Sequence, residues 1–359
     1  MNLTIHGDRI RNTLSVSDFK HEVLLVTIKH VSELAGVSQA TVSRVVNGTT
    51  RVSHDKKLKV EKAIKELGYR PNSIAQALAS SRTGSVGVVV PELGGSFFSG
   101  ILQSIEGHLR RLGYHAVVTA GSNTEQGQRE SVEFLLGRRV DALILHTQQL
   151  CDDYLIALEA KGIPIVLINR VIPEMQASCI DIDNEEGARL ATQYLLQKGH
   201  KRIACITGPL DKSDARGRLQ GYRRALEEAG LVYNPAIVSE ASFTEETGVS
   251  AMQKLLRRGG HFTAVFASND HMAFGAFEVL KREGFSVPED VSLVGFDNVL
   301  FARYLTPGLT TVNFPIEEMS IEAVQLTIQK LSKNKCDVNF QLSPVLVVRN
   351  SVKDLLKTL

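Results

Sequence analysis

The sequence of 359 residues has few cysteines and no long apolar run. Its four cysteines, Cys151, Cys179, Cys205 and Cys336, lie far apart and form neither a CxxC pair nor a Cys/His cluster at metal-ligand spacing. This pattern is typical of buried thiols in a reducing cytosol. No run of about 18 apolar residues occurs, so we expect no helix that spans a membrane.

The sequence also lacks the motifs of the common enzyme classes. It contains no GxxxxGK[ST] phosphate loop, no HExxH, no GxSxG and no dinucleotide-binding GxGxxG. The N-terminal segment MNLTIHGDRIRNTLSVSDFK has charges throughout, without the apolar core or small-residue cleavage site of a secretory signal. We therefore expect a cytoplasmic protein that is not an enzyme and uses no cofactor or metal.

The composition has no large excess of either charge, but the charge is unevenly distributed. At roughly 100 to 200 residues per domain, two or three domains are expected, and a chain that is 43% hydrophobic can bury large cores. Residues 27–83 hold ten Lys/Arg against four Asp/Glu, a net charge of +6, whereas the chain from residue 84 onward is mildly acidic. A basic head on an acidic body suggests a polyanionic partner for the head alone. The alternative is a solvated, Lys-rich helix face.

The basic segment has the pattern of a helix-turn-helix. Helix 28–35 is predicted after the N-cap Thr27, a turn at Gly36, helix 39–47 after the N-cap Ser38, and a third helix from near Ser53 to Gly68. The apolar positions of these helices predict a small core, with Ile28, Val31, Leu34, Ala35, Val42, Val45, Val46, Leu58, Ala63, Ile64 and Leu67 as its members.

Helix-turn-helix units place the start of their second helix against base edges in the major groove. Gln39 can bond adenine, Ala40 can touch a thymine methyl group, and Arg44, one turn later, can bond guanine. The competing interpretation is a protein-binding helical hairpin in which these side chains are merely solvated.

This segment resembles the headpiece of the lactose/galactose repressor (LacI/GalR) family, without gaps, over TIKHVSELAGVSQATVSRVVNGTTRVSHDKKLKVEKAIKELGYRPNSIAQALAS. The resemblance implies that YRPNSIAQALA is a hinge helix that folds on the operator and inserts Leu78 into the minor groove. An ordinary contact within a linker helix is the alternative for Leu78. The implied DNA-binding residues are Thr27, Ser38, Gln39, Ala40, Thr41, Ser43, Arg44, Asn47, Asn72, Ala75, Gln76 and Leu78.

The resemblance also predicts the domain boundaries. Residues 27–70 form the DNA-binding domain, residues 71–84 the hinge helix and linker, and residues 85–359 the effector-binding and dimerisation domain. Residues 1–26 have no counterpart in the family. Either translation starts at Val26 from an alternative start codon, or these residues form a polar N-terminal arm.

From Ser85 onward, short apolar runs alternate with amphipathic helices. The runs VGVVVP, HAVVTA, ALILH, PIVLI, IACIT, AIVSE, TAVFAS and VSLVGF predict parallel strands covered on both faces, with ligands at their carboxyl ends. The intervening segments predict helices, one near 125–136 and one that buries Ile101, Leu102, Ile105, Leu109 and Leu112. About 270 residues of this pattern exceed one comfortable sheet, so two lobes are expected.

The body resembles the regulatory domain of the same family, through SVGVVVPELGGSFFSGI, VLINRVIP, SDARGRLQGYRRAL, FTAVFASNDHMAFGAF, VSLVGFDNVLFARYLTPGLTTV and VLVVRNSV. The expected fold class is therefore an all-α headpiece followed by an α/β domain of two Rossmann-like lobes, as in periplasmic binding proteins. The resemblance further implies three crossovers that join the lobes and an effector that binds between them. Within the family the sequence is most similar to the galactose repressor and isorepressor, through LILH, VLINRV and RLQGY.

A sugar site needs carboxylates and amides for hydroxyl pairs, an Arg fork and an aromatic face. The positions that match the family's effector site are Arg218, Phe243, Asn269 and Asp297, and the first lobe adds the candidates Phe97, Phe98, His146 and Asn169. The alternatives are N-capping for Asp297 and for Asp270, a core position for Phe98, and a satisfied polar residue for His146. Arg170 is expected either to bridge the lobes or to stabilise Glu174.

We therefore predict a homodimeric transcriptional repressor that leaves a pseudo-palindromic, double-stranded DNA operator when a galactose-like sugar binds. The alternatives are a regulator that needs a co-repressor, as in the purine branch of the family, and a solute-binding protein. A sugar-modifying enzyme is the third alternative. The chain ends at SVKDLLKTL without a leucine-heptad tail, so a dimer is expected rather than a tetramer.

Overall fold

The computed structural model describes residues 26–47, 52–69, 82–259, 261–332 and 340–357. The chain divides into two compact units, Met1–Ser81 and Arg82–Leu359, and each is described by itself. The predicted hinge residues Asn72, Ala75, Gln76 and Leu78, and almost all of the 1–26 extension, lie outside the described residues.

The first unit is a bundle of three short helices, α1 (Ile28–Ala35), α2 (Gln39–Asn47) and α3 (His54–Leu67). The predicted caps are present: the Thr27 backbone N–H donates to Nδ1 of His30 at 3.2 Å, and the Thr41 N–H donates to the Ser38 hydroxyl at 3.3 Å. Gly36 and Gly68 end α1 and α3 in the left-handed conformation, which glycine adopts without strain. The core consists of Val31, Ala35, Val42, Val60 and Ala63.

Two predicted members of this core are wrong. Leu34 is 47% exposed and Leu58 is 52% exposed, whereas Val60 is fully buried instead. Three short helices cover only the centre of each apolar stripe, so residues at its edges stay in contact with solvent.

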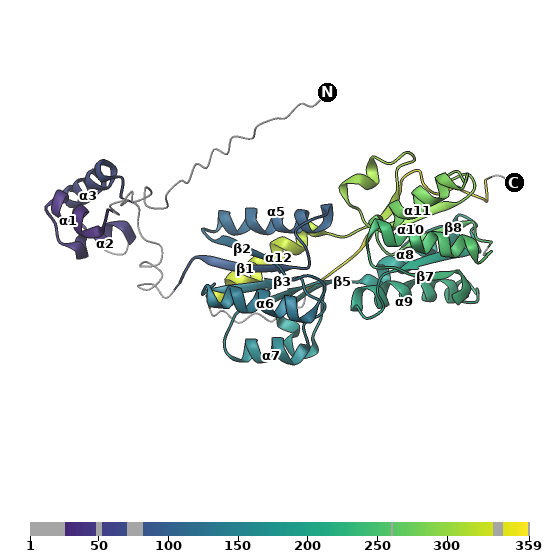
Figure 1. Ribbon diagram of the computed structural model, residues 1–359, viewed down its shortest axis with the longest axis horizontal. Helices are drawn as coiled ribbons and strands as arrows, with labels where there is room; N and C mark the ends of the chain where they lie inside the picture. Colours follow the sequence, from purple (N-terminus) through teal and green to yellow (C-terminus); the bar gives the residue numbers. More distant parts are fainter. Residues whose placement is uncertain (1–25, 48–51, 70–81, 260, 333–339, 358–359) are drawn as a thin grey trace, which may run out of the picture. The chain divides into compact units, whose positions relative to one another are not determined.

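The first lobe of the second unit is a parallel six-stranded sheet in the order β11-β5-β4-β3-β1-β2. Helices α5 and α12 cover one face of the sheet, and α6 and α7 cover the other (Figure 1). The elements of this lobe are β1 (Ser85–Val90), α5 (Ser96–Arg111), β2 (His115–Ala120), α6 (Glu125–Gly137), β3 (Ala142–Leu145), α7 (Asp152–Ala160), β4 (Ile165–Ile168), β5 (Cys179–Ile182), α12 (Ile316–Leu331) and β11 (Phe340–Leu342).

The second lobe repeats this architecture with the strand order β12-β10-β9-β8-β6-β7, in which only β12 is antiparallel to its neighbour. Helices α8 and α9 pack on one face and α10 and α11 on the other. Its elements are α8 (Asn184–Gln197), β6 (Ile203–Thr207), α9 (Ser213–Glu228), β7 (Val238–Glu240), α10 (Glu245–Arg257), β8 (Ala264–Ala267), α11 (Asp270–Arg282), β9 (Ser292–Asp297), β10 (Thr310–Asn313) and β12 (Val345–Val347).

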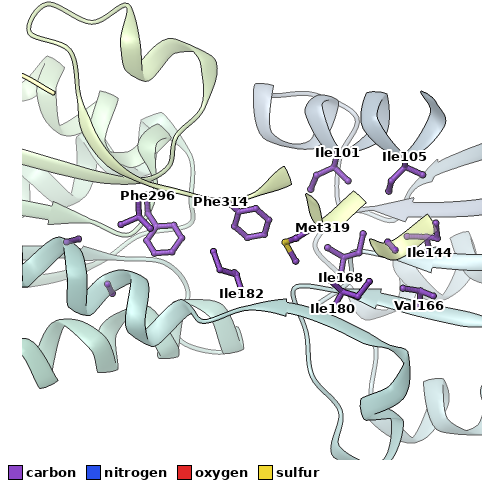
Figure 2. Close-up of a cluster of buried hydrophobic side chains, with 14 of the residues drawn as sticks. Ile101, Ile105, Ile144, Val166, Ile168, Ile180, Ile182, Phe296, Phe314 and Met319 are labelled. Carbon is purple, nitrogen blue, oxygen red and sulfur yellow. The ribbon is translucent and has the colours of Figure 1, made fainter. Parts of the chain in front are cut away.

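Three crossovers join the lobes, as expected: β5 continues into α8, β10 into α12, and β11 into β12. One hydrophobic cluster extends through this junction from one lobe to the other. Figure 2 shows Ile182 and Phe314 between Phe296 of the second lobe and Met319 of the first. The lobes therefore share a core around the crossovers and diverge beyond it.

The predicted strands are present in the sheets, but the short strands β5, β10, β11 and β12 were not predicted from the apolar runs. Leu112, expected in the core, follows α5 and is 52% exposed. Cys179 and Cys205 are buried as expected, whereas Cys151 is exposed, and Cys336 lies outside the described residues. Within the described part of the chain, no helix has both the length and the apolar character needed to cross a membrane.

Candidate functional site

A cleft lies between the lobes, where the carboxyl ends of strands from both sheets meet. All eight residues that the sequence suggested for an effector site line it: Phe97, Phe98, His146, Asn169, Arg218, Phe243, Asn269 and Asp297. Residues that are distant in sequence converge here because parallel strands all end at the same edge of a sheet.

The second lobe supplies a buried ion pair at the base of the cleft. Arg218, on α9, is 3% exposed, and its Nη1 lies 3.3 Å from Oδ1 of Asp297 at the end of β9. The guanidinium also donates to Oδ1 of Asn184 at 2.9 Å and to the Ser268 carbonyl, and lies 3.7 Å from the centre of the Phe296 ring. These contacts hold the Arg218 fork in one orientation before any ligand arrives.

Asp297 is held in a conformation that side chains seldom adopt, with a φ of 105°. Burial raises the pKa of its carboxyl group to about 6, although the neighbouring Arg218 acts in the opposite direction. It caps no helix, since the following 3₁₀ turn is capped by Val299. The capping alternative is therefore wrong for Asp297, and its strained backbone positions a carboxylate at the cleft.

Asn269 is the N-cap of α11, and it also lines the cleft. Its Oδ1 accepts from the Met272 N–H at 2.9 Å, and its Nδ2 donates to the Phe243 carbonyl at 2.9 Å. Phe243 has a φ of 66°, and its ring lies over Gly208 so closely that a Cβ there would be 2.1 Å from the ring. The absence of a side chain at Gly208 therefore gives this aromatic ring its place at the cleft.

The first lobe presents an aromatic pocket around one buried histidine. His146, which follows β3, is 5% exposed and meets the rings of Phe97 and Phe98 edge-to-face, at 6.0 and 5.3 Å between centroids. Burial lowers the pKa of His146 to about 4, so the ring is neutral at pH 7. Neither ring nitrogen has a hydrogen-bond partner among the described residues. The alternative, a satisfied polar residue, is therefore wrong for His146, whose neutral ring has one donor and one acceptor for use.

Asn169 links the two lobes at the back of the cleft. Its Nδ2 donates to Oδ2 of Asp214 on α9 at 3.3 Å, and its Oδ1 accepts from Asn184 Nδ2 at 3.2 Å. Asn184 in turn accepts from Arg218. A continuous chain of buried hydrogen bonds therefore connects β4 of the first lobe to the Arg218–Asp297 pair of the second.

Further polar contacts cross the cleft at its rim. Lys212 Nζ donates to Asn123 Oδ1 at 3.3 Å, Ser213 Oγ to Gln148 Oε1 at 3.1 Å, and Gln149 Nε2 to Asp211 Oδ2 at 3.3 Å. All three join loops of the first lobe to the start of α9. They are exposed, so each contributes little by itself, and the rim can open without losing core contacts.

Two sequence-based interpretations near the site are wrong. Arg170 neither bridges the lobes nor pairs with Glu174; it donates to the carbonyls of Thr147 and Leu150 and pairs with Asp152 within the first lobe. Asp270 is the first residue of α11 rather than its N-cap. Its carboxylate accepts from the Thr311 hydroxyl at 2.6 Å and the Val299 N–H at 2.9 Å, and burial raises its pKa well above the ordinary value.

Sequence reasoning also missed nine polar residues that line the cleft: Glu92, Asn123, Gln128, Gln148, Lys212, Asp214, Ser242, Thr244 and His271. One signal was present in the sequence, because Asp214 lies four residues before Arg218 and thus on the same face of α9. Gln128 lies in the first turn of α6 and His271 in the first turn of α11, and the others lie on loops or at helix caps whose direction the apolar pattern does not fix.

In the first unit, α2 presents the expected polar face. Gln39 and Ala40 begin the helix and are exposed, and Arg44 is exposed one turn later. Thr27 is exposed at the start of α1, Thr41 and Ser43 are half-buried, and Asn47 ends α2. No ion pair within the described residues involves Arg44, so its charge faces solvent.

Two family models match the sequence. The model for bacterial regulatory proteins of the lacI family matches residues 27–72, and the model for periplasmic binding proteins and the sugar-binding domain of the LacI family matches residues 83–349. Together they cover the three-helix unit and both lobes.

Characterised relatives match over nearly the whole chain. The HTH-type transcriptional regulator GalR of Escherichia coli (strain K12) is 41% identical over 330 residues, which cover 91% of this chain and 96% of GalR. The HTH-type transcriptional regulator CelR of Thermobifida fusca is 39% identical over 90% of this chain and 98% of its own length. The relatives are transcriptional regulators and not enzymes.

Solved structures with the same fold include two regulators. A transcriptional regulator CelR–cellobiose complex has a TM-score of 0.70 at 38% identity, over 91% of this chain and 99% of that one. The Lac repressor dimer bound to operator and the anti-inducer ONPF has a TM-score of 0.84 at 31% identity, with the same coverage.

Proposed function

The chain belongs to the lacI family of bacterial regulatory proteins, and from this premise we propose that it is a DNA-binding repressor whose operator affinity is set by a galactose-like sugar in the cleft. The repressor acts in the cytoplasm as a homodimer on a pseudo-palindromic operator. The similarity to GalR and to the Lac repressor dimer supports these assignments.

The composition of the cleft is the observation that supports a sugar. A buried carboxylate and guanidinium, Asp297 and Arg218, face a neutral, unpartnered His146 across a cleft that Phe97, Phe98 and Phe243 also line. Charged groups of this kind bind pairs of hydroxyls, and aromatic faces cover the apolar face of a pyranose ring. A nucleobase would need a planar slot between rings, whereas Phe97 and Phe98 meet edge-to-face at 81°.

The DNA-binding role rests on the exposed face of α2. Gln39, Ala40 and Arg44 lie where base edges are contacted in a helix-turn-helix complex, and the lysines of α3 add positive charge for phosphates. Each protomer of the proposed dimer would bind one half-site. This arrangement requires a symmetric operator.

The sugar acts by changing the relative orientation of the lobes. Because the cleft is lined from both lobes, a ligand has different contacts in open and closed arrangements, and only such a difference can shift an equilibrium. The rim contacts of Lys212, Ser213 and Gln149 and the buried Asn169–Asp214 bond are the interactions that change with lobe orientation.

The proposal is tested by fluorescence anisotropy of the purified protein on its own upstream DNA, at fixed salt, with and without galactose and a panel of small sugars. Nanomolar binding that one sugar releases is the expected result, in the range of specific protein–DNA complexes. Tight binding that a ligand strengthens would replace induction with co-repression. Absence of specific binding would contradict the repressor assignment.

A further inference from the structure

The end of the first lobe opposite the cleft gathers the connections that lead into its strands. The amino ends of β1, β2 and β3 lie in register here: Ser85 pairs with His115, and the Asp141 N–H donates to the Ser85 carbonyl at 2.7 Å. Adjacent strands are about 4.8 Å apart, so the starts of β2 to β4 span roughly 14 Å. Helices α5, α6 and α7 all end at this edge (Figure 1).

These helix ends carry exposed cations that have no acidic partner. Arg111 ends α5, Arg138 and Arg139 follow α6, and Lys161 follows α7; all four are exposed. None of them forms an ion pair with any residue in the described ranges. We call these four residues the basic end.

The carboxylates nearby are already engaged. Glu106 pairs with Arg110, and Glu159 pairs with Lys330 at 3.0 Å. The Asp141 carboxylate accepts from the backbone N–H groups of Thr83 and Gly84, both at 2.8 Å. Its N–H partners are neutral and leave the charge of Asp141 in place, so the four cations of the basic end outnumber this carboxylate, which has no ion-pair partner among the described residues.

Cations at helix C-termini are favoured by the helix dipole, and this alone would explain their presence. What distinguishes this end is the route of the chain. Arg82, Thr83 and Gly84 enter the body here, fixed by the Asp141 contacts and by the bond from Arg82 Nη2 to the Leu331 carbonyl at 2.8 Å. The polypeptide that carries the DNA-binding unit is therefore joined to the body next to the basic end.

From this juxtaposition we propose that the basic end is a second, sequence-independent DNA-binding surface, which contacts phosphates that flank the operator. The proposal rests on the proposed function, because DNA held by the three-helix unit is tethered to this surface by the chain. Tethering raises the local concentration of phosphates, so contacts too weak to bind free DNA add to the affinity of the whole complex.

The test measures the affinity of the full chain for two duplexes as a function of salt. One duplex contains only the operator from its own upstream DNA; the other extends it by about 20 base pairs on each side, which is about two helical turns. We expect the extended duplex to bind about tenfold more tightly at low salt, with a salt slope steeper by about 0.9 for each added phosphate contact. The variant Arg111→Gln/Arg138→Gln/Arg139→Gln loses this gain and binds the short duplex as the wild type does.

The matched control is Lys201→Gln/Arg202→Gln, which removes two exposed cations from the corresponding connection before β6 in the second lobe, and which retains the gain. Equal affinity of the wild type for both duplexes overturns the proposal. So does a triple variant that keeps the full gain in affinity for the extended duplex, or a control variant that loses this gain to the same extent as the triple variant. Failure of the wild type to bind the short duplex would instead contradict the proposed function. Thermal unfolding of each variant verifies that the fold is intact.

Discussion

The face of α2 and the cleft are both candidate binding sites, but they are built in opposite ways. On α2, Gln39, Ala40 and Arg44 project into solvent from a helix whose stability comes from residues on its other side. In the cleft, Arg218 and Asp297 are 3% and 6% exposed and are themselves part of the packed interior.

On α2, the side chains that recognise the partner contribute little to the stability of the protein. In the cleft, the side chains that would bind the ligand also stabilise the fold. Removing a side chain from an exposed helix face loses only the contacts of that side chain with the partner. Removing a buried charge does more, because it leaves another charge without a partner in a medium that solvates it poorly. Substitutions in the two sites should therefore differ in what they change.

The largest effect is expected for Arg218→Ala. The substitution leaves Asp297 buried without its cation and Asn184 Oδ1 without its donor, so the free energy of unfolding should fall by about 3–5 kcal/mol. Urea unfolding of the full chain measures it, with Gln220→Ala, exposed on the same helix, as the control that changes it by about 0.5 kcal/mol or less. An equally small effect for both would show that the cleft is not a structural unit.

Asp297→Ala should abolish the effector response. It also leaves Arg218 buried without its carboxylate and so lowers the free energy of unfolding, but the protein that remains folded should still bind the operator. Loss of two charge-assisted hydrogen bonds to hydroxyls corresponds to about 100-fold or more in sugar affinity. Isothermal titration with the active sugar, alongside operator anisotropy, measures both quantities. Asp297→Asn keeps an acceptor for Arg218 and should restore part of the response; a normal response in Asp297→Ala would place the effector elsewhere.

Arg44→Ala should reduce the affinity for the operator by about 1–3 kcal/mol at one base position without changing the stability of the protein. The arginine is exposed, so no buried partner is left behind. Anisotropy on operator duplexes with single base changes identifies that position. An equal loss on operator and random DNA would refute a base contact.

His146 gives the cleft a pH-dependent contribution to the free energy of unfolding, which α2 lacks. The folded pKa is about 4 and the ordinary value is 6.5, so the unfolded chain binds a proton in this window that the folded protein does not. Its contribution to stability is present above pH 6.5 and is lost as the pH falls towards 4, at about 1.4 kcal/mol per pH unit. In the variant His146→Leu, this part of the dependence of the free energy of unfolding on pH should disappear. Unfolding curves recorded between pH 4 and 7 measure it. An unchanged slope would contradict a neutral, buried ring.

The smallest effect is expected for Lys59→Ala. Lys59 is more than half exposed and pairs with Asp55 at 2.9 Å within α3, so its loss should hardly change stability. If Lys59 contacts a phosphate, the affinities for operator and for random DNA should fall alike by a few-fold in the variant. The slope of log affinity against log salt concentration should fall by about 1. Selective weakening on the operator would assign it to base recognition instead.

Much of this arrangement was predictable from sequence, because local signals fix local structure. Ser38, Gly36 and Gly68 delimit helices through cap chemistry that depends on one or two residues, and long apolar runs identified the central strands. The short strands β5, with the sequence CIDI, and β10, with TTVN, lack such a run. They became strands because neighbouring strands supply their hydrogen bonds.

The site was predictable where it depends on strand ends and unpredictable where it depends on the approach of the lobes. His146 and Asn169 follow strands and Asp297 is the last residue of one, and the topology brings such residues to one edge. Asn123 and Lys212 lie on loops of different lobes, and only the packed crossovers place them 3.3 Å apart. Asp270 was misjudged because its partners, Val299 and Thr311, are distant in sequence.

Strand β3 connects two features that have so far been described separately. It begins next to Asp141, which holds the incoming chain at Thr83 and Gly84, and it ends next to His146 in the cleft. At about 3.3 Å per residue, a rod of roughly 17 Å joins these points, and its buried neighbours on both sides prevent it from bending. Because β3 is hydrogen-bonded to β1 on one side and to β4 on the other, it cannot slide along its axis by itself, and His146 and the anchor of the incoming chain belong to one stiff sheet.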